Sequence, residues 1–130
     1  MFTEKEVAFL KSQLLARIAT VDGHGQPDVV PVGFEFDGEA FYIGGRDVAR
    51  TRKFRNVQAG QSRVALVIDE LESVSPWIAR GIRVYGTADL VERVGHLGPG
   101  TYLRVTPHTS WSWNVETPSL VKTVHTEHVR

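Results

Sequence analysis

The order of hydrophobic and polar positions along the chain predicts a fold made mostly of short β-strands. Apolar residues fall in short stretches that end at Gly, Pro or Asp, as strands end at turns. Residues 63–69 are almost continuously apolar, which predicts a central strand covered on both faces. Asp37-Gly38 favours a type I′ hairpin, Gly86 a bulge or barrel corner, and residues 95–100 a loop. The stretches with strand character are residues 15–21, 29–36, 40–44, 63–69, 82–91 and 102–106, with 120–124 as a further candidate.

Two helices complete this pattern. Thr3 and Glu6 have the spacing of a capping box, and Val7 and Leu10 follow at helical spacing, so a short amphipathic helix opens the chain. A second helix is predicted over roughly residues 49–59. About six short strands with two peripheral helices favour a single domain, residues 1–130, that folds as a small antiparallel β-barrel.

Composition narrows the classes of function. The 130 residues contain 15 Lys and Arg and 15 Asp and Glu, so no net charge attracts the protein to nucleic acid or to a membrane surface. The absence of cysteine excludes disulfides, thiolate metal sites and thiol nucleophiles. No apolar stretch approaches the roughly 20 residues of a membrane span, and Met1 is not followed by a cationic leader. We therefore expect a soluble, cytoplasmic protein whose ligand chemistry comes from local clusters of residues.

The second helix carries the most informative cluster. A strand ends at Gly44 and Gly45, and the first turn of the helix that follows is basic. Unpaired N–H groups at a helix start, together with cationic side chains, suit a phosphate. A solvated basic helix face is the alternative interpretation. The basic residues of this segment are Arg50, Arg52, Lys53 and Arg55.

Pro31 in the second strand stretch needs an explanation, because proline cannot donate a hydrogen bond to a strand ladder. It marks an edge strand, a bulge, or a place where a ligand lies against the backbone. Gly33 points to the same face, since residues two apart on a strand share a face. The pair predicts either a flat shelf for a planar ring or a bend in the barrel.

Taken in order, several short motifs resemble the pyridoxamine 5′-phosphate oxidase-like superfamily of flavin-binding split barrels. Within it, the sequence is most similar to the actinobacterial branch that uses the deazaflavin coenzyme F-420. The similarity runs from about Leu15 to Trp113 and lies in the order and spacing of the motifs. The segments that carry it are residues 18–21, 27–34, 41–43, 51–53, 56, 63–67, 80–88 and 107–113.

The resemblance implies a six-stranded split barrel of the FMN-binding type, a homodimer, and a cofactor in a cleft at the dimer interface. It implies that Pro31, Val32 and Gly33 line the cofactor ring and that Tyr42 and Ile43 lie beside it. Thr51, Arg52 and Lys53 would hold the phosphate, with Arg50 and Asn56 beside them. Trp111, or else Trp113, would be the late aromatic near the ring.

Two departures from the flavin mononucleotide (FMN) oxidases favour F-420 over FMN. The second strand stretch has no phosphate-binding arginine, and residues 118–122 lack the Arg-Leu signature of true pyridoxamine phosphate oxidases. The expected activity is hydride transfer to a small unsaturated or conjugated substrate. FMN-dependent redox chemistry and non-catalytic carriage of F-420 or flavin are the alternatives.

No motif in the sequence identifies a catalytic residue. There is no Ser/His/Asp spacing and no metal motif, and His125 and His128 near the C-terminus are better explained as part of a frayed tail. His108 is a candidate proton donor to the substrate, although capping of a turn after Pro107 is the preferred interpretation. Trp111 and Trp113 would share one face of a strand, as an aromatic wall or as core.

Overall fold

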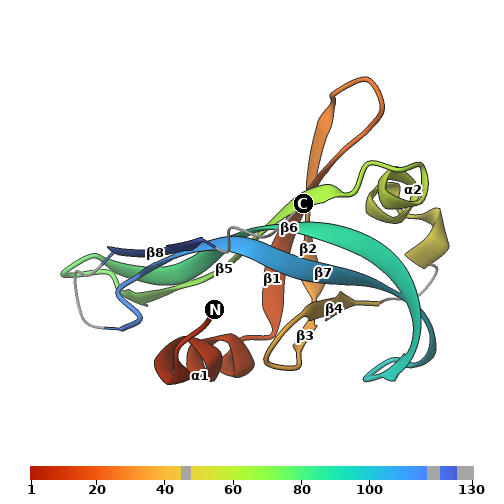
Figure 1. The fold of residues 1–130 in the computed structure, drawn as a ribbon. Coiled ribbons are helices and arrows are strands. Elements are labelled where there is room, and N and C mark those ends of the chain that lie inside the picture. The colour runs from red at the N-terminus through yellow and green to blue at the C-terminus, as the bar shows by residue number, and fades with distance from the viewer. Residues whose placement is uncertain (45–47, 117–120, 126–130) are drawn as a thin grey trace.

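The protein is a strongly curved antiparallel sheet with two helices packed against it (Figure 1). The computed structural model describes residues 1–44, 48–116 and 121–125. No helix in these residues is long and apolar enough to cross a membrane. The elements are α1 (Glu4–Ser12), β1 (Leu15–Val21), β2 (Pro27–Gly33), β3 (Glu35–Phe36), β4 (Phe41–Ile43), the 3₁₀ helix η1 (Val48–Arg50), α2 (Arg52–Gln58), β5 (Arg63–Ser73), β6 (Ile78–Gly95), β7 (Gly98–Trp113) and β8 (Val121–His125).

The strand order makes the sheet an open, split barrel. Neighbouring strands follow the order β2-β1-β5-β6-β7-β4-β3, and β8 also pairs with β7. The predicted mostly β split barrel with peripheral helices is confirmed, but the sheet contains eight strands and not six. Phe34 interrupts the stretch 29–36 and divides it into β2 and β3, and the further candidate at 120–124 is present as β8.

Two long strands dominate the sheet. β6 and β7 pair from Gly81↔Trp113 to Gly95↔Gly98, so the stretch 95–100 is the tip of a hairpin and not a loop. Gly98 makes this tight turn possible because its φ of 87° is accessible to glycine at little cost. The register shifts between Tyr85 and Gly86, which confirms the predicted bulge at Gly86.

The predicted type I′ turn at Asp37-Gly38 is wrong. That turn needs positive φ at both central residues, and Asp37 does not have it. Because Phe36 pairs with Phe41, the loop has four residues. The Asp37 carboxylate accepts the backbone N–H groups of Glu39 and Ala40, each at 2.8 Å, and these bonds stabilise the wider loop.

The predicted capping box opens α1. Thr3 Oγ1 accepts the Glu6 N–H at 3.2 Å, and Glu6 Oε1 accepts the Thr3 N–H at 2.9 Å. The same carboxylate is buried and accepts the Ser112 hydroxyl at 2.6 Å through Oε2. Glu6 therefore caps the helix and ties it to β7.

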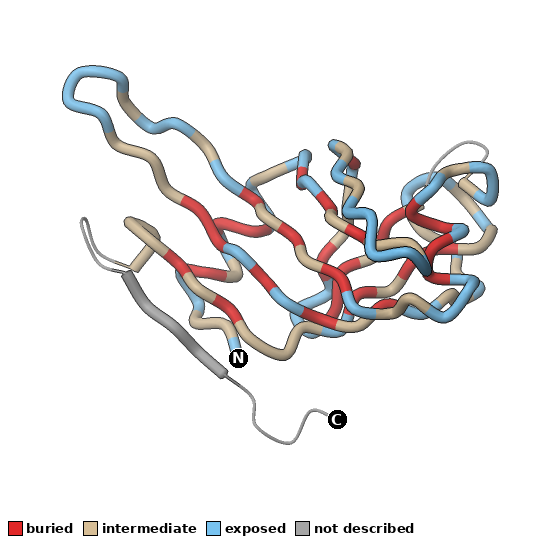
Figure 2. Tube along the Cα trace, turned by 90° about the horizontal axis from the view of Figure 1, so that it is seen from above, coloured by how far each residue is buried: buried red, intermediate tan, exposed pale blue. Residues whose placement is uncertain are grey.

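Burial alternates along the central strands (Figure 2). On β5, Val64, Leu66 and Ile68 are buried in the core, whereas Ala65 and Val67 point outward and are half-buried. The expectation of a central strand is confirmed, because β5 lies between β1 and β6. The expectation that it is covered on both faces is wrong for a single chain. The sheet thus has an inner face that holds the core and an outer face that is open but partly apolar.

Replacing Gly86 by Ala should destabilise the protein. A Cβ at Gly86 would lie 2.5 Å from the Thr106 carbonyl oxygen, which belongs to the backbone and has little room to move. We expect a loss of about 1–3 kcal/mol in the free energy of unfolding, measured by urea denaturation. Gly23→Ala is the matched control, since a Cβ there meets nothing within 4 Å. Equal stability of the two variants would contradict the close approach at the bulge.

Candidate functional site

The basic segment 49–59 is two short helices and not one. η1 ends at Arg50 and α2 begins at Arg52, with Thr51 between them in an extended conformation. The Thr51 hydroxyl donates to the Val48 carbonyl at 2.6 Å, so it closes η1 and does not cap α2. The predicted basic first turn of one short helix is therefore divided between η1 and α2. The site depends instead on which basic side chains this break directs inward.

Lys53 is the basic residue that points inward. Its side chain is 9% exposed, whereas Arg50, Arg52 and Arg55 are exposed. Burial lowers the pKa of the Lys53 ammonium, and the nearby Asp28 carboxylate partly opposes that shift. No ion pair to Lys53 is present among the described residues. A dianionic ligand such as a phosphate would raise this pKa again and would be held more firmly for that reason.

Asn56 fixes the position of Lys53. Its amide Nδ2 donates to the Thr20 hydroxyl at 2.9 Å, and both residues are buried. Thr20 is on the inner side of β1 and pairs in register with Asp28 of β2. The structure therefore brings Lys53 and Asn56 together against the β1–β2 hairpin, one helical turn apart. The partners Thr20 and Asp28 were not foreseen from the sequence, because their contact with α2 is non-local.

β2 forms one edge of the sheet, since β1 is its only partner among the described strands. This confirms the edge-strand interpretation of Pro31. Pro31 and Gly33 are exposed on the outer face, and a Cβ at Gly33 would come no closer than 3.9 Å to its nearest neighbour, the Leu14 carbonyl oxygen. Val32 was expected to line the ring and Ile43 to lie beside it, but both side chains are buried in the core, so only their backbone groups are available to a ligand.

Tyr42 borders a hollow of about 300 Å³ that also includes Gly33, Phe34 and Gly44. Its ring lies under the Arg93 guanidinium, 3.8 Å from ring centroid to Cζ. Burial, followed by a hydrogen bond with Asp37, raises the pKa of the Tyr42 phenol. The remaining lining residues are Leu14, Glu35, His96 and Leu97. The structure thus joins two of the predicted ring-side residues, Gly33 and Tyr42, in one hollow.

The β6–β7 tip lines this hollow through His96 and Leu97, which sequence patterns did not indicate. Glu35 Oε2 accepts the His96 N–H at 2.9 Å, and Glu35 Oε1 lies 3.4 Å from Arg93 Nη2. These bonds hold the end of the hairpin against β3. No local pattern indicates this contact, because the residues are about sixty positions apart.

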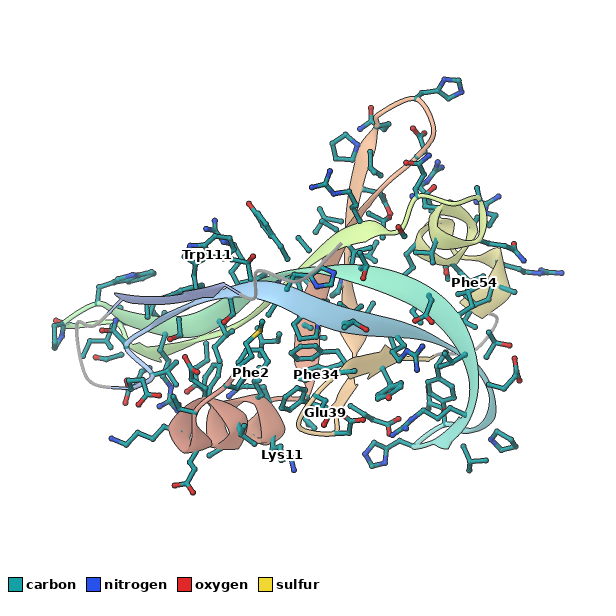
Figure 3. All side chains as sticks on the ribbon, in the orientation of Figure 1. Phe2, Lys11, Phe34, Glu39, Phe54 and Trp111 are labelled. Atoms are coloured by element: carbon teal, nitrogen blue, oxygen red, sulfur yellow. The ribbon has the colours of Figure 1, made fainter. Side chains whose placement is uncertain are left out.

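Trp111 is far from the shelf within one chain. Pro31, Arg17, Val67, Arg83 and Trp111 form one row across β2, β1, β5, β6 and β7. Four strand spacings of about 4.8 Å separate the ends of this row by about 19 Å along the sheet. Trp111 lies on the opposite side of the sheet from the core residues Phe2 and Phe34 (Figure 3). A ring on Pro31 and Gly33 therefore does not reach Trp111 of the same chain.

The outer face also contains a larger hollow, of about 600 Å³, that the sequence analysis did not predict. It includes His108, whose Nε2 lies 2.9 Å from the Thr87 hydroxyl. His108 is within β7, so the preferred interpretation that it caps a turn after Pro107 is wrong. The side chains of His125 and His128 lie outside the described residues. In the described part of the chain, no three His, Cys, Asp or Glu residues are grouped as metal ligands.

The edge strand and the largely buried lysine offer a ligand an exposed strand surface and a cation. Comparison with known protein families shows the family to which the chain belongs. The family described as pyridoxamine 5′-phosphate oxidase matches residues 2–117. The chain belongs to this family. The match covers α1 and the sheet through β7.

The chain is also similar to individual proteins with known names or structures. The chain is 40% identical over 122 residues to a 5a,11a-dehydrotetracycline/5a,11a-dehydrooxytetracycline reductase from Streptomyces rimosus, covering 88% of this chain and 84% of the relative. A solved F420 reductase has a TM-score of 0.66 at 22% identity, covering 84% of this chain and 98% of that one. The heme storage protein HutZ from Vibrio cholerae has a TM-score of 0.62 at 18% identity, covering 83% and 92%. The two structures share the split-barrel fold with this chain.

Asn56→Ala should loosen α2 from β1. The change leaves the Thr20 hydroxyl buried without its amide partner, which costs about 1–3 kcal/mol of the free energy of unfolding. Thermal and urea denaturation measure this loss, and hydrogen exchange of the α2 amides should show faster opening of the helix. Gln58→Ala, on the exposed side of the same helix, is the control. Indistinguishable stabilities would mean that the Asn56–Thr20 bond does not anchor α2.

Proposed function

We propose that the protein is an oxidoreductase that uses coenzyme F-420 to reduce a conjugated carbon–carbon double bond in a planar substrate. The observation that carries this proposal is the largely buried residue Lys53, whose charged form is disfavoured by burial and favoured by Asp28 on the edge strand β2. An anionic ligand offsets the desolvation of such a lysine, which has no ion pair among the described residues. Membership of the family and the 40% identical reductase support the direction of the chemistry.

The residues present fit an F-420-type cofactor. Lys53 and the exposed Arg52 would hold the phosphate, and the unpaired backbone groups of β2 would bind the polar edge of the ring. Pro31 and Gly33 leave space for a ring to lie flat against that strand. FMN has a similar ring and also carries a phosphate. F-420 is favoured because β2 contains no arginine to supply the second phosphate ligand of the FMN oxidases.

The chemistry needs little from the protein beyond binding and positioning. A bound, reduced deazaflavin supplies the hydride. Asn56 holds α2 in place, so that Lys53 sets the depth of the phosphate and hence of the ring. Glu35 holds the β6–β7 tip over the hollow beside Tyr42, which excludes water from that end of the site.

We further propose that the active form is a homodimer. The outer face exposes Leu15, Val29 and Tyr85, which are large apolar side chains for an open sheet surface. Trp111 lies about 19 Å from Pro31 in its own chain, by the strand spacing of the row they share. A second copy packed on this face would bring its own Trp111 to the ring. The site would then be completed by two chains.

The substrate class follows from the reductase relative. That protein acts on a dehydrotetracycline, according to its name. By analogy, we propose a small conjugated, fused-ring substrate for this protein. Oxidation or reduction with FMN, or carriage of the cofactor without catalysis, are the competing functions that the following titration separates.

Titration of the cofactor-free protein with F-420, followed by ligand fluorescence, should give tighter binding than titration with FMN. Lys53→Ala should weaken F-420 binding by about 1.5–3 kcal/mol, because it removes a charge-assisted bond to the phosphate. Arg55→Ala, on the exposed side of α2, is the matched control and should bind as the wild type does. Unchanged affinity of a folded Lys53→Ala protein would exclude the phosphate role. Preference for FMN would assign the protein to the flavin enzymes, and a bound F-420 that never transfers hydride to a conjugated ketone would assign it to the carriers.

The dimer is tested by sedimentation equilibrium at micromolar concentration. We expect a mass twice that of the 14.5 kDa chain. Trp111→Ala should lower F-420 affinity while Trp77→Ala, at an exposed position on the β5–β6 turn, leaves it unchanged. A monomer with full F-420 affinity would contradict the shared site.

A further inference from the structure

The hollow of about 600 Å³ on the outer face follows from the sizes of neighbouring side chains. Ala19 of β1 pairs in register with Ala65 of β5, so two of the smallest side chains lie next to each other on the outer face. Tyr85 on β6 is next to Ala65 in the same row, is much larger, and also lines the hollow. The hollow therefore has a low floor at the two alanines and a wall at Tyr85. We call it the alanine recess.

One wall of the alanine recess is an ordered aromatic side chain. The Tyr85 ring meets the Trp111 ring edge to face, with centroids 4.7 Å apart and planes at 70°. Arg83 Cζ lies 4.1 Å from the Trp111 centroid and 5.6 Å from the Tyr85 centroid. These contacts hold Tyr85 upright at the side of the recess, so little side-chain entropy is lost when a flat molecule stacks on it.

The adjacent pair of positions on β5 and β6, Arg63 and Thr87, makes one end of the alanine recess polar, and this end has no negative charge among the described lining residues. Arg63 pairs in register with Thr87, and the Thr87 hydroxyl is bonded to His108. Arg63 has no ion pair among the described residues, and none of the described residues that line the recess is Asp or Glu. A guanidinium, a hydroxyl and an imidazole together suit an oxygen that is anionic or accepts hydrogen bonds.

The alanine recess is also on the correct side of the sheet to work with the proposed cofactor. Pro27 is at its rim, and Pro31 is four positions further along the same strand and the same face, at about 13 Å. Val29, between them, forms part of the same face. A planar molecule in the recess would therefore extend towards a ring lying on Pro31 and Gly33.

We propose that the alanine recess is the substrate site, and that its substrate is a flat, fused-ring molecule with a phenol or enol oxygen at one end. The rings lie on Ala19 and Ala65 and stack against Tyr85, and the oxygen is bound by Arg63 with Thr87 and His108. A volume of about 600 Å³ is in the range of small-molecule sites and exceeds what one side chain of a second copy fills. The proposal rests on the proposed reductase function for its chemistry, but binding in the recess can be measured without any cofactor.

Binding is tested on the cofactor-free protein with two fused-ring probes, tetracycline and 1,8-dihydroxyanthraquinone, and with phenol as a single-ring control. Quenching of tryptophan fluorescence reports the probe, because Trp111 touches the Tyr85 wall. Isothermal titration calorimetry gives the affinities. We expect both fused-ring probes to bind much more tightly than phenol, since only they cover the alanine floor and the wall together.

The decisive variants fill the alanine recess or leave it open. Ala65→Leu should weaken probe binding roughly tenfold or more, because the added side chain occupies the floor. Val67→Leu is the matched control, since Val67 is on the same strand and face but outside the recess, and it should change affinity less than about twofold. Ala19→Val repeats the test from the neighbouring strand if Ala65→Leu folds poorly. Arg63→Gln should weaken both fused-ring probes roughly fivefold or more, because it removes the charge that binds the phenol or enol oxygen.

Several outcomes would overturn the proposal. One is equal probe affinity in the wild type, Ala65→Leu and Ala19→Val, and another is an equal loss in Val67→Leu. A third is loss of probe binding that accompanies a change of sedimenting mass in Ala65→Leu, which would make the recess a contact between two copies of the chain. The F-420 titration is independent of these measurements. Normal F-420 binding without probe binding would reject only the recess, and the reverse would reject only the cofactor.

Discussion

The fold depends on one constraint, which is that the sheet is buried on only one side and does not close. Core residues from every long strand, such as Ile18, Leu66 and Val84, point to the inner face. β2 has no second partner and remains an edge. An open edge must be covered or used, because its N–H and C=O groups are unpaired. α2 packs against β1 through the bond from Asn56 to Thr20, and that packing brings Lys53 close to Asp28 on the edge strand. The candidate site exists because the barrel is split.

Much of the fold was predictable from the sequence, because local patterns of apolar and polar residues determine it. Apolar stretches located β1 and β5, alternation located β6, and the Thr3–Glu6 spacing located the start of α1. The errors fall where tertiary contacts override local preference. Asp37 uses its carboxylate to widen a turn that its neighbours favour as tight. The glycine-rich stretch 95–100 is drawn into a hairpin because β6 and β7 curl over β3 and pair to their ends.

The site was predictable only in part, and the physical reason is the two-residue period of a strand. A motif in sequence names consecutive residues, but a strand sends them to opposite faces. Pro31 and Gly33 reach the surface, whereas Val32 is turned into the core. Strand order and register are also not visible in the sequence. For this reason the sequence did not indicate that Trp111 is far from Pro31 and Gly33, or that Ala19 pairs with Ala65. The sequence did not distinguish Lys53 from the other basic residues of its segment, because the burial of Lys53 near Asp28 depends on the register of β1 and β2.

The hydrogen bond between Asn56 and Thr20 has a consequence for how this protein can change over time. Thr20 faces inward and anchors the helix, and Ala19, the preceding residue on β1, faces outward on the floor of the alanine recess. The inner face of β1 therefore anchors α2, and the outer face of the same strand forms part of the recess. Substitutions at outward positions can reshape the recess while the inward positions keep the fold and the lysine in place. Relatives built on this sheet can therefore differ in the ligand that the recess binds while they keep the same packing of the core.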